Sequence, residues 1–185
     1  MSEEDKRLLK RLHNADLDAL YCVYEKYSDD LLAVAVSLLS DIHTAEDCLH
    51  DVFVNLVSTS NDLKIRSNIK GYLISCVANR ARDCIRKRVR QPDCPLTRSE
   101  NLTTSNNPIV QLIESEESAQ LIKALAQLPY EQREIFVLHA QAGMKFPRIA
   151  GLFDVSVNTV QSRYRYAIEK LQALLEKEND HEIRK

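Results

Sequence analysis

The stretch "DVSVNTVQSRYRYAIEKL", from Asp154 to Leu171, decides the fold of the second half of this chain. Its apolar residues recur at helical spacing and predict one buried stripe, made of Val157, Val160, Tyr164, Ala167, Ile168, Leu171 and Leu174. The opposite face is basic and rich in hydrogen-bonding groups, although the formal net charge of the chain is -2. A solvated helix face usually carries Glu and Lys. This face therefore favours contact with DNA, whose major groove accepts a helix.

The residues before this helix predict a helix-turn-helix. One helix, about 112–127, stops at "LPY", and the next begins at Glu131 and is ended by Gly143 as its C-cap. Pro147 suits the first turn of a short third helix, and Ser156 is the expected N-cap of the fourth. The second helix turns four residues inward, namely Ile135, Phe136, Leu138 and His139. Two helices joined by the tight turn "DVS" form the helix-turn-helix pattern.

The first half of the chain contains a helix predicted over about 44–57. Thr44 is the expected N-cap, followed by acidic residues in the first turn, where the helix dipole favours negative charge. One face is apolar and consists of Ala45, Cys48, Leu49, Val52, Phe53 and Leu56. The opposite, acidic face consists of Glu46, Asp47, His50, Asp51 and Asn55.

Helices are also predicted on both sides of this one. The segment 18–39 forms one or two helices, with apolar positions at Leu20, Val23, Tyr24, Tyr27, Leu31, Leu32 and Ala35. A long helix over about 69–90 buries Ile69, Tyr72, Leu73, Cys76, Val77, Ala81 and Cys84. It turns Asn79, Arg82, Arg86 and Arg90 outward.

Charge is strongly segregated between these helices. From Asn79 to Arg90 there are six basic residues and one acid, whereas from Asp41 to Asp51 there are four acids and no Lys or Arg. Separate patches of opposite sign indicate two kinds of partner, one polyanionic and one basic.

The chain as a whole predicts an all-α fold of two small helical domains joined by a flexible linker, the C-terminal domain being the helix-turn-helix. Only three Gly and no Trp occur among the 185 residues. The segment "QPDCPLTRSENLTTSNN" breaks both the periodicity and the hydrophobicity, which is typical of a linker. We therefore expect domains over 8–90 and 112–178, with the linker at 91–111.

Composition limits the compartment and the cofactors. No run of about 18 apolar residues is present, so no membrane insertion is expected. The charged N-terminus "MSEEDKRLLKRL" lacks the apolar run of a signal peptide, which predicts a cytoplasmic protein. The five Cys show no CxxC spacing, which favours reduced and mostly buried thiols. Neither a metal site nor a cofactor is predicted, because Cys48, His50 and His43 match no usual zinc spacing.

At this point the chain resembles a family. "LPYEQREIFVLHAQAGMKFPRIAGLFDVSVNTVQSRYRYAIEKL" is similar to the C-terminal promoter-binding domain of bacterial RNA polymerase sigma factors. "TAEDCLHDVFVNLV" and "GYLISCVANRARDCIRKRVR" resemble their core-binding and promoter-melting domain. The two-domain layout is that of the extracytoplasmic-function (ECF) group. Two motif sets in the right order, from about Asp18 to Leu175, make this resemblance specific.

The resemblance implies a transcription initiation factor without an active site, which binds core RNA polymerase, directs it to promoter DNA and assists melting. The acidic face would bind polymerase through Glu46, Asp47, His50, Asp51 and Asn55. The minus-ten element would be bound by Asn61, Asp62, Lys64, Arg66, Asn79, Arg80, Asp83, Arg86 and Lys87. The minus-thirty-five element would be bound by Arg148, Asn158, Thr159, Gln161, Ser162, Arg163, Arg165 and Tyr166. Many members are held inactive by an anti-sigma factor, which is a further candidate partner.

In the family a base is flipped from the non-template strand at the minus-ten element and held in a pocket. Flipping a base costs on the order of a few kcal/mol, which contacts to the single strand must offset. The predicted loop 58–68 has no aromatic residue, so polar side chains would hold the base there.

The chain departs from the family pattern at six positions. Tyr72 stands where Trp is usual, His50 where Gln is common, and Asp154 where Gly is usual in the turn. Asp154 can adopt a left-handed conformation at modest cost. Arg148 replaces a frequent Glu, Asn158 a common Gly and Gln161 a frequent Arg or Lys. Tyr72 is expected to change how the melting helix packs. The changes at the positions that read DNA bear on which element is recognised and leave the expected role unchanged.

Two other functions compete with this one. A helix-turn-helix regulator could bind operators without polymerase, but it would need neither the acidic helix nor a melting domain. A nuclease could hold a metal with Asp47 and Asp51 on one helical turn. No further ligand joins those two at a clear spacing, and the chain has no phosphate-binding Gly loop.

Overall fold

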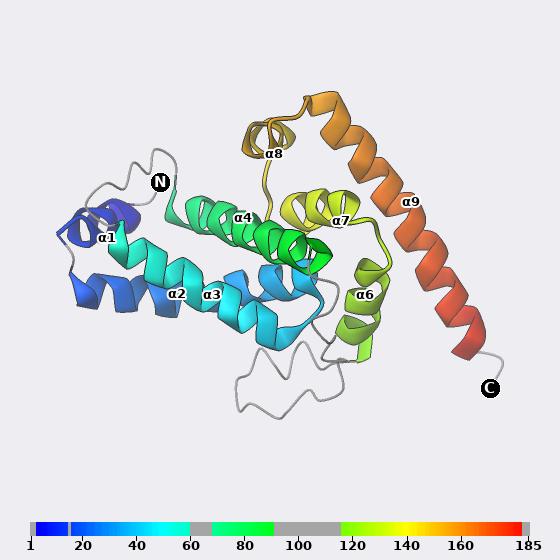
Figure 1. Ribbon diagram of the computed structural model, residues 1–185, viewed down its shortest axis with the longest axis horizontal. Helices are drawn as coiled ribbons and strands as arrows, with labels where there is room; N and C mark the ends of the chain where they lie inside the picture. The colour runs from blue at the N-terminus through cyan, green and yellow to red at the C-terminus, as the bar shows by residue number, and fades with distance from the viewer. Residues whose placement is uncertain (1–2, 15, 60–67, 91–115, 183–185) are drawn as a thin grey trace. The chain divides into compact units, whose positions relative to one another are not determined.

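The structure is a computed structural model that describes residues 3–14, 16–59, 68–90 and 116–182. Within those residues every regular element is a helix, which confirms the predicted all-α class (Figure 1). The chain divides into two compact units, one of Met1–Ala35 with Asp41–Leu96 and one of Val36–Ser40 with Thr97–Lys185. The predicted linker, 91–111, lies outside the described residues.

The first unit contains helices α1 (Glu3–Leu12), α3 (Ile42–Ser58) and α4 (Ile69–Arg90), and α2 (Leu17–Leu39) as far as Ala35. α2 is one helix rather than two, and α3 packs against α4. All six residues of the predicted apolar stripe on α3 are buried. The core is completed from α2 and α4 by Val23, Tyr27, Leu31, Leu32, Ala35, Ile69, Leu73, Ile74, Val77, Ala78 and Ala81.

Some predicted core positions lie nearer the surface. Tyr24 is 47% exposed, although its ring packs edge-on against Phe53 at a centroid distance of 4.9 Å. Tyr72, Cys76 and Cys84 are half-buried on α4. Helical periodicity identifies one face of a helix, but neighbouring helices decide how far round that face the burial extends.

The N-cap of α3 is Asp41, and the expectation of Thr44 was wrong. Asp41 has an extended backbone with φ -150° and ψ 121°, and its carboxylate accepts a hydrogen bond from Thr44 N–H at 3.1 Å. The Thr44 hydroxyl also donates to that carboxylate. Arg88 of α4 donates to the Thr44 hydroxyl at 2.5 Å and lies 3.7 Å from Asp41 Oδ2. The basic end of α4 therefore stabilises the N-terminus of α3.

Helix α1 was not predicted from the sequence. It buries Leu8, Leu9 and Leu12, with acidic residues in its first turn and basic ones in its last. Asp5 is buried and accepts a hydrogen bond from the Tyr27 hydroxyl of α2 at 2.8 Å. Burial, and then the hydrogen bond to Asp5, raise the pKa of the Tyr27 hydroxyl. The charged N-terminus is thus an amphipathic helix that is tied to α2.

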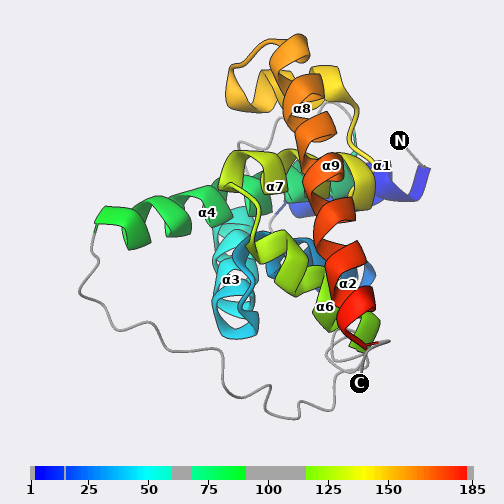
Figure 2. The ribbon, with the colours of Figure 1, turned by 90° about the vertical axis from the view of Figure 1, so that its right-hand side faces the viewer.

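The second unit contains α6 (Glu116–Ala126), α7 (Tyr130–Phe136), the π-helical turn η2 (Val137–Gln141), α8 (Phe146–Phe153) and α9 (Val157–Glu182). α9 packs against α6, α7 and α8. Figure 2 shows α9, coloured orange to red, as the longest helix of this unit, with α8 near its N-terminal end. α9 continues beyond the helix predicted from the opening stretch and ends at Glu182.

The predicted helix from Glu131 to Ala142 widens after Phe136 into η2, where Ala142 N–H donates to the Val137 carbonyl at 3.0 Å. Gly143 follows with φ +66°, a left-handed conformation that favours glycine, so its predicted role at the helix end is confirmed. His139 points inward as expected, stacks on Phe146 at a centroid distance of 3.9 Å and meets Tyr164 edge-on at 4.7 Å. This aromatic cluster fixes α8 and α9 to the end of α7.

Candidate nucleic-acid and polymerase interfaces

The turn between α8 and α9 has the geometry that the sequence predicts. Asp154 is left-handed, with φ 53° and ψ 48°, and its N–H donates to the Ala150 carbonyl. Ser156 caps α9, because its hydroxyl oxygen accepts a hydrogen bond from Thr159 N–H at 3.0 Å. This tight turn allows the N-terminal half of α9 to stand on α8 with its outer face exposed.

The structure brings most of the predicted minus-thirty-five residues to that outer face. Asn158, Gln161, Ser162, Arg165 and Tyr166 are exposed. Thr159, Arg163 and Arg148 of α8 are half-buried and flank it. The Arg165 guanidinium lies 5.3 Å from the centre of the Tyr166 ring, and its Nε lies 3.9 Å from Glu169 Oε1.

Val157 was predicted to be buried and is 36% exposed at the first turn of α9. It adds an apolar side chain beside Asn158, so the surface offers hydrogen-bonding, cationic and apolar groups together. Such a mixture is what base edges and thymine methyl groups require.

The predicted polymerase-binding face of α3 is divided by the structure. Glu46, Asp47, His50 and Asn55 are exposed, and His43 Nδ1 lies 3.7 Å from Glu46 Oε2. Asp51 differs, because its carboxylate forms a salt bridge with Arg80 of α4. One member of the predicted polymerase set is therefore paired with one member of the predicted minus-ten set.

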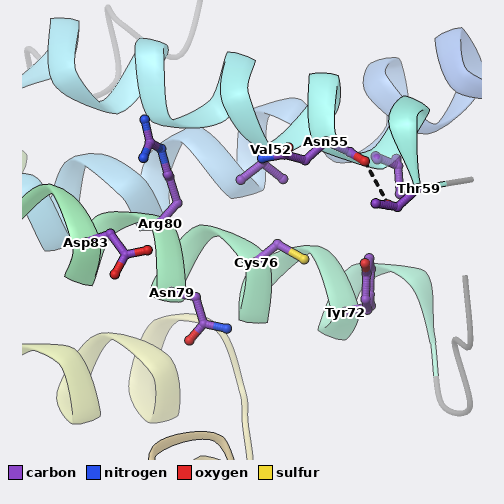
Figure 3. A pocket seen from close by; sticks show the side chains of 9 residues that line it. Val52, Asn55, Thr59, Tyr72, Cys76, Asn79, Arg80 and Asp83 are labelled. Atoms are coloured by element: carbon purple, nitrogen blue, oxygen red, sulfur yellow. Dashed lines mark hydrogen bonds between the residues drawn. The ribbon is translucent and has the colours of Figure 1, made fainter.

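A pocket of about 240 Å³ lies between α3 and α4, and Figure 3 shows its side chains. It is lined by Val52, Asn55, Leu56, Thr59, Tyr72, Cys76, Asn79, Arg80 and Asp83. Three of these residues, Asn79, Arg80 and Asp83, were predicted to bind the minus-ten element. Asn55, Thr59, Tyr72 and Cys76 also line the pocket and were not predicted to bind the minus-ten element. Tyr72 and Cys76 could have been identified from the sequence, because their spacing places them on the same face of the helix as Asn79 and Asp83.

Arg80 extends from α4 toward α3 in this pocket (Figure 3). Burial is the largest single effect and lowers the pKa of its guanidinium, but the hydrogen bond and charge of Asp51, together with the nearby thiols of Cys84 and Cys48, leave the pKa raised. Its Nε is buried and has no hydrogen-bond partner among the described residues. Arg80 is thus held by Asp51 through Nη2, while its buried Nε forms no hydrogen bond within the part of the chain that the structure describes.

Other cations of α4 are less constrained. Arg86 lies 3.9 Å from Asp83 on the same helix, and Lys87 and Arg90 are exposed. Arg80 and Arg88, by contrast, pair with Asp51 and Asp41 of α3. The opposite charges that are separate in the sequence are therefore partly paired in space.

The predicted minus-ten residues Asn61, Asp62, Lys64 and Arg66 lie outside the described residues. The described chain resumes at Asn68, whose Oδ1 accepts a hydrogen bond from Gly71 N–H at 2.5 Å and so caps α4. Thr59 and Tyr72, which stand on either side of these predicted minus-ten residues in the sequence, both line the pocket.

The alternative of a metal-dependent nuclease gains no support. Asp51 is occupied by Arg80, and within the described ranges no three His, Cys, Asp or Glu side chains are placed to hold a metal ion. No described helix is long and apolar enough to cross a membrane. Cys22, Cys48, Cys76 and Cys84 are free thiols, of which Cys48 is buried and Cys22 is exposed against expectation.

A helix-turn-helix with an exposed polar helix, accompanied by a helical unit with a cation-rich helix and a polar pocket, defines a DNA-binding transcription protein. Comparison with known proteins narrows this class. Residues 23–91 match the family model "Sigma-70 region 2", and residues 118–171 match "Sigma-70, region 4".

Individual relatives agree with the family models. The RNA polymerase sigma factor CnrH of Cupriavidus metallidurans is 30% identical over 146 residues, covering 73% of this chain and 75% of CnrH. The ECF RNA polymerase sigma factor EcfG of Rhodopseudomonas palustris is 27% identical, covering 78% of each chain. The ECF RNA polymerase sigma factor SigW of Bacillus subtilis is 22% identical, covering 92% of this chain and 96% of SigW.

Solved structures share the fold. The sigma factor RpoE of Bartonella quintana, in complex with the anti-sigma factor NepR, superposes with a TM-score of 0.66 at 26% identity, covering 86% of this chain and 95% of RpoE. CnrH in complex with the cytosolic domain of CnrY gives a TM-score of 0.68 at 23% identity, covering 94% and 97% of the two chains. The chain belongs to the ECF group of RNA polymerase sigma factors. It is a factor for promoter-specific initiation of transcription by RNA polymerase.

Proposed function

We propose that the two units divide promoter recognition between them. The exposed N-terminal half of α9 reads the minus-thirty-five element in the major groove. α4 and the pocket bind the minus-ten element, and the exposed residues of α3 bind core polymerase. In this proposal the protein has no catalytic site and acts in the cytoplasm, where the polymerase carries out all the chemistry.

The observation that supports this proposal best is the pocket between α3 and α4. It has a polar rim of Asn55, Asn79, Arg80 and Asp83 and an apolar floor of Val52 and Leu56. An unstacked base has the same two requirements, hydrogen bonds at its edge and apolar contact at its faces. Tyr72 adds an aromatic ring that the adjoining predicted loop lacks, so stacking can contribute to holding the base.

The cations near the pocket are placed to contact the phosphates of a single DNA strand. Arg86, Lys87 and Arg90 are exposed on α4 beyond Asp83. A single strand whose base enters the pocket would place its next phosphates along these side chains. Asn61, Asp62, Lys64 and Arg66 are proposed to contact the same strand from the neighbouring segment.

The proposed polymerase surface consists of Glu46, Asp47, His50, Asp51 and Asn55. Of its three carboxylates, that of Asp51 is paired with Arg80 and that of Glu46 lies 3.7 Å from His43 Nδ1. A basic partner surface would complement it and accelerate association. RpoE was solved with an anti-sigma factor, and we propose that this chain is controlled by a protein of the same kind.

Run-off transcription tests the proposal. Core RNA polymerase and the purified chain should give a defined transcript from DNA upstream of the gene for this chain, and each component alone should give none. Permanganate footprinting of unpaired thymines then reports melting. Asn79→Ala and Arg86→Ala should reduce that reactivity about fivefold or more, since each removes a polar contact of about 1–3 kcal/mol.

Lys10→Ala is the matched control for these variants, because Lys10 is an exposed cation on α1, away from the pocket residues. It should leave melting unchanged. Normal permanganate reactivity in both Asn79→Ala and Arg86→Ala would show that α4 does not bind the melted strand.

A further inference from the structure

The salt bridge between Asp51 and Arg80 joins two surfaces that the proposed function assigns to different partners. Asp51 lies on α3 next to the exposed acids of the polymerase surface, and Arg80 lines the pocket on α4. Both residues belong to the first unit, so the pair is formed within one packed body.

This pair changes the charge that the pocket presents to DNA. Arg80 is the single cation among the pocket-lining residues, and Asp83 is the single acid. When Asp51 neutralises Arg80, the pocket lining has no unpaired cation left to attract phosphate, and Asp83 of the lining lies 3.9 Å from Arg86 on the same helix. When Arg80 is released, its guanidinium can bind a phosphate or a base edge.

The pair is also exposed enough to be exchanged. The Arg80 side chain is 31% exposed and that of Asp51 is 39% exposed, so a second cation from solution can reach the carboxylate. Ion pairs with this exposure contribute little to stability and are readily replaced by competing partners. Asp47 lies one turn before Asp51 and is exposed, so it draws basic groups to this side of α3.

We propose that Asp51 is a positioning residue that holds Arg80 away from nucleic acid in the free protein. When polymerase binds, one of its basic side chains replaces Arg80 as the partner of Asp51. Arg80 is then free to contact the non-template strand. This inference rests on the proposed function, because it assumes that α3 binds polymerase and that the pocket binds DNA. It makes binding to polymerase the event that switches on the DNA contact.

The first experiment measures binding of the free, full-length chain to a labelled single-stranded oligonucleotide of mixed sequence by fluorescence anisotropy. Asp51→Asn should bind about fivefold tighter than the parent, and its salt dependence should steepen by about 0.7 for one added phosphate contact. Glu25→Gln is the charge control, because it removes one acid from an exposed site of α2 that lies outside the pocket. It should change the affinity by less than about twofold.

Arg80→Gln distinguishes the release of Arg80 from a general effect of removing one negative charge. In the Asp51→Asn background it should abolish the gain, and it should lower the affinity by a larger factor there than in the parent. Should asparagine not be tolerated at position 51, Asp51→Ser is a second neutral replacement with the same expectation. The proposal is overturned if Asp51→Asn matches Glu25→Gln, or if the gain survives Arg80→Gln.

The second experiment tests the role of polymerase. Arg80→Gln is compared with the parent in two assays. The substitution should reduce open-complex formation by the holoenzyme by a larger factor than it reduces oligonucleotide binding by the free chain. Equal factors would show that polymerase does not release Arg80. Failure of the parent to support run-off transcription would instead contradict the proposed function, so the two failures can be told apart.

Discussion

Asn55 illustrates how a single side chain can belong to two surfaces. It was predicted on the acidic face of α3, and it is exposed there, yet it also lines the pocket with Asn79. Its backbone carbonyl accepts a hydrogen bond from the Thr59 hydroxyl at 2.7 Å, which orders the end of α3 at the pocket rim. A residue of α3 can therefore belong to both the proposed polymerase surface and the proposed DNA pocket.

Gln161 is the residue whose replacement should change which promoters are used. It is exposed on α9, and its amide can form two hydrogen bonds with adenine. Gln161→Ala should alter the preference at one base pair of the minus-thirty-five element by about 1–3 kcal/mol. Transcription by the holoenzyme from a promoter library randomised in that element, read by sequencing the transcripts, measures the change.

Arg163→Ala is the comparison for that experiment. Arg163 flanks the exposed face and is half-buried, as suits a phosphate contact. Its loss should weaken all promoters alike and flatten the salt dependence by about 0.9. An unchanged sequence preference in Gln161→Ala would mean that Gln161 does not read bases.

Cys48 should make the first unit sensitive to alkaline pH. Burial raises the pKa of its thiol to about 12, with Cys84 adding to the effect and Arg80 opposing it. In the unfolded chain a thiol titrates near 8.5. Because the folded pKa is the higher one, the stabilisation is complete below about pH 8.5 and is lost as pH rises toward 12.

The measurement is urea unfolding of the parent and of Cys48→Ala at about pH 8 and pH 10. Stability of the parent should fall by up to about 1.4 kcal/mol per pH unit from this thiol alone. Cys48→Ala should begin less stable but fall less steeply. Equal slopes in the two proteins would show that Cys48 is not the titrating group.

At the level of helices, the contact between α3 and α4 explains most of what the sequence could and could not predict. Six apolar residues at helical spacing were enough to identify the buried face of α3. The partners of Asp41 and Asp51 are Arg88 and Arg80, far along the chain, so their pairing depends on how the helices pack. The contribution of α3 to the pocket was missed for the same reason, since the lining comes from two helices.

Local sequence patterns predicted the turn before α9 correctly, but they gave the wrong cap for α3 and did not reveal α1. The left-handed Asp154 and the Ser156 cap follow from turn chemistry, which is local. Thr44 was predicted as the cap of α3, whereas the cap is Asp41; both are good cap residues a few positions apart, and only backbone geometry distinguishes them. Helix α1 was missed because three leucines among many charges give a weak pattern.

Asp41→Ala should therefore destabilise the protein more than Thr44→Ala. The Asp41 carboxylate satisfies the Thr44 N–H and lies next to Arg88, so its removal should reduce the free energy of unfolding by about 1–2 kcal/mol. Thr44→Ala keeps that backbone contact and should lose less. Urea unfolding at neutral pH compares the two, and a larger loss in Thr44→Ala would restore Thr44 as the cap.

At the level of the whole molecule, a formal net charge of -2 conceals surfaces of opposite character. The first unit presents exposed acids on α3 and exposed cations toward the end of α4, while the second presents a polar and basic α9. The proposed function assigns these surfaces to three partners, namely polymerase, duplex DNA and a melted strand. Composition alone predicts none of these surfaces, because the charges cancel in the sum.

Asp47→Lys should weaken assembly with core polymerase while preserving the fold. Asp47 is exposed, and substitutions at such sites usually change stability by about 0.5 kcal/mol or less. Co-purification with core polymerase should fall about tenfold, because a cation would face a basic surface. Glu25→Lys on α2 is the control and should co-purify normally; if Asp47→Lys does so as well, the exposed acids of α3 are only a solvated surface.

The π-helical turn η2 has a consequence for how the length of this chain can change over evolution. The hydrogen bond from Ala142 N–H to the Val137 carbonyl spans one residue more than an α-helical turn does. Deleting the exposed Ala140 would let the segment close into an ordinary α-helix with its hydrogen bonds intact. A deletion early in α9 would instead rotate every later side chain by about 100° around the helix axis. Length variation among descendants of this sequence should therefore collect at 137–141 and be absent from 157–166.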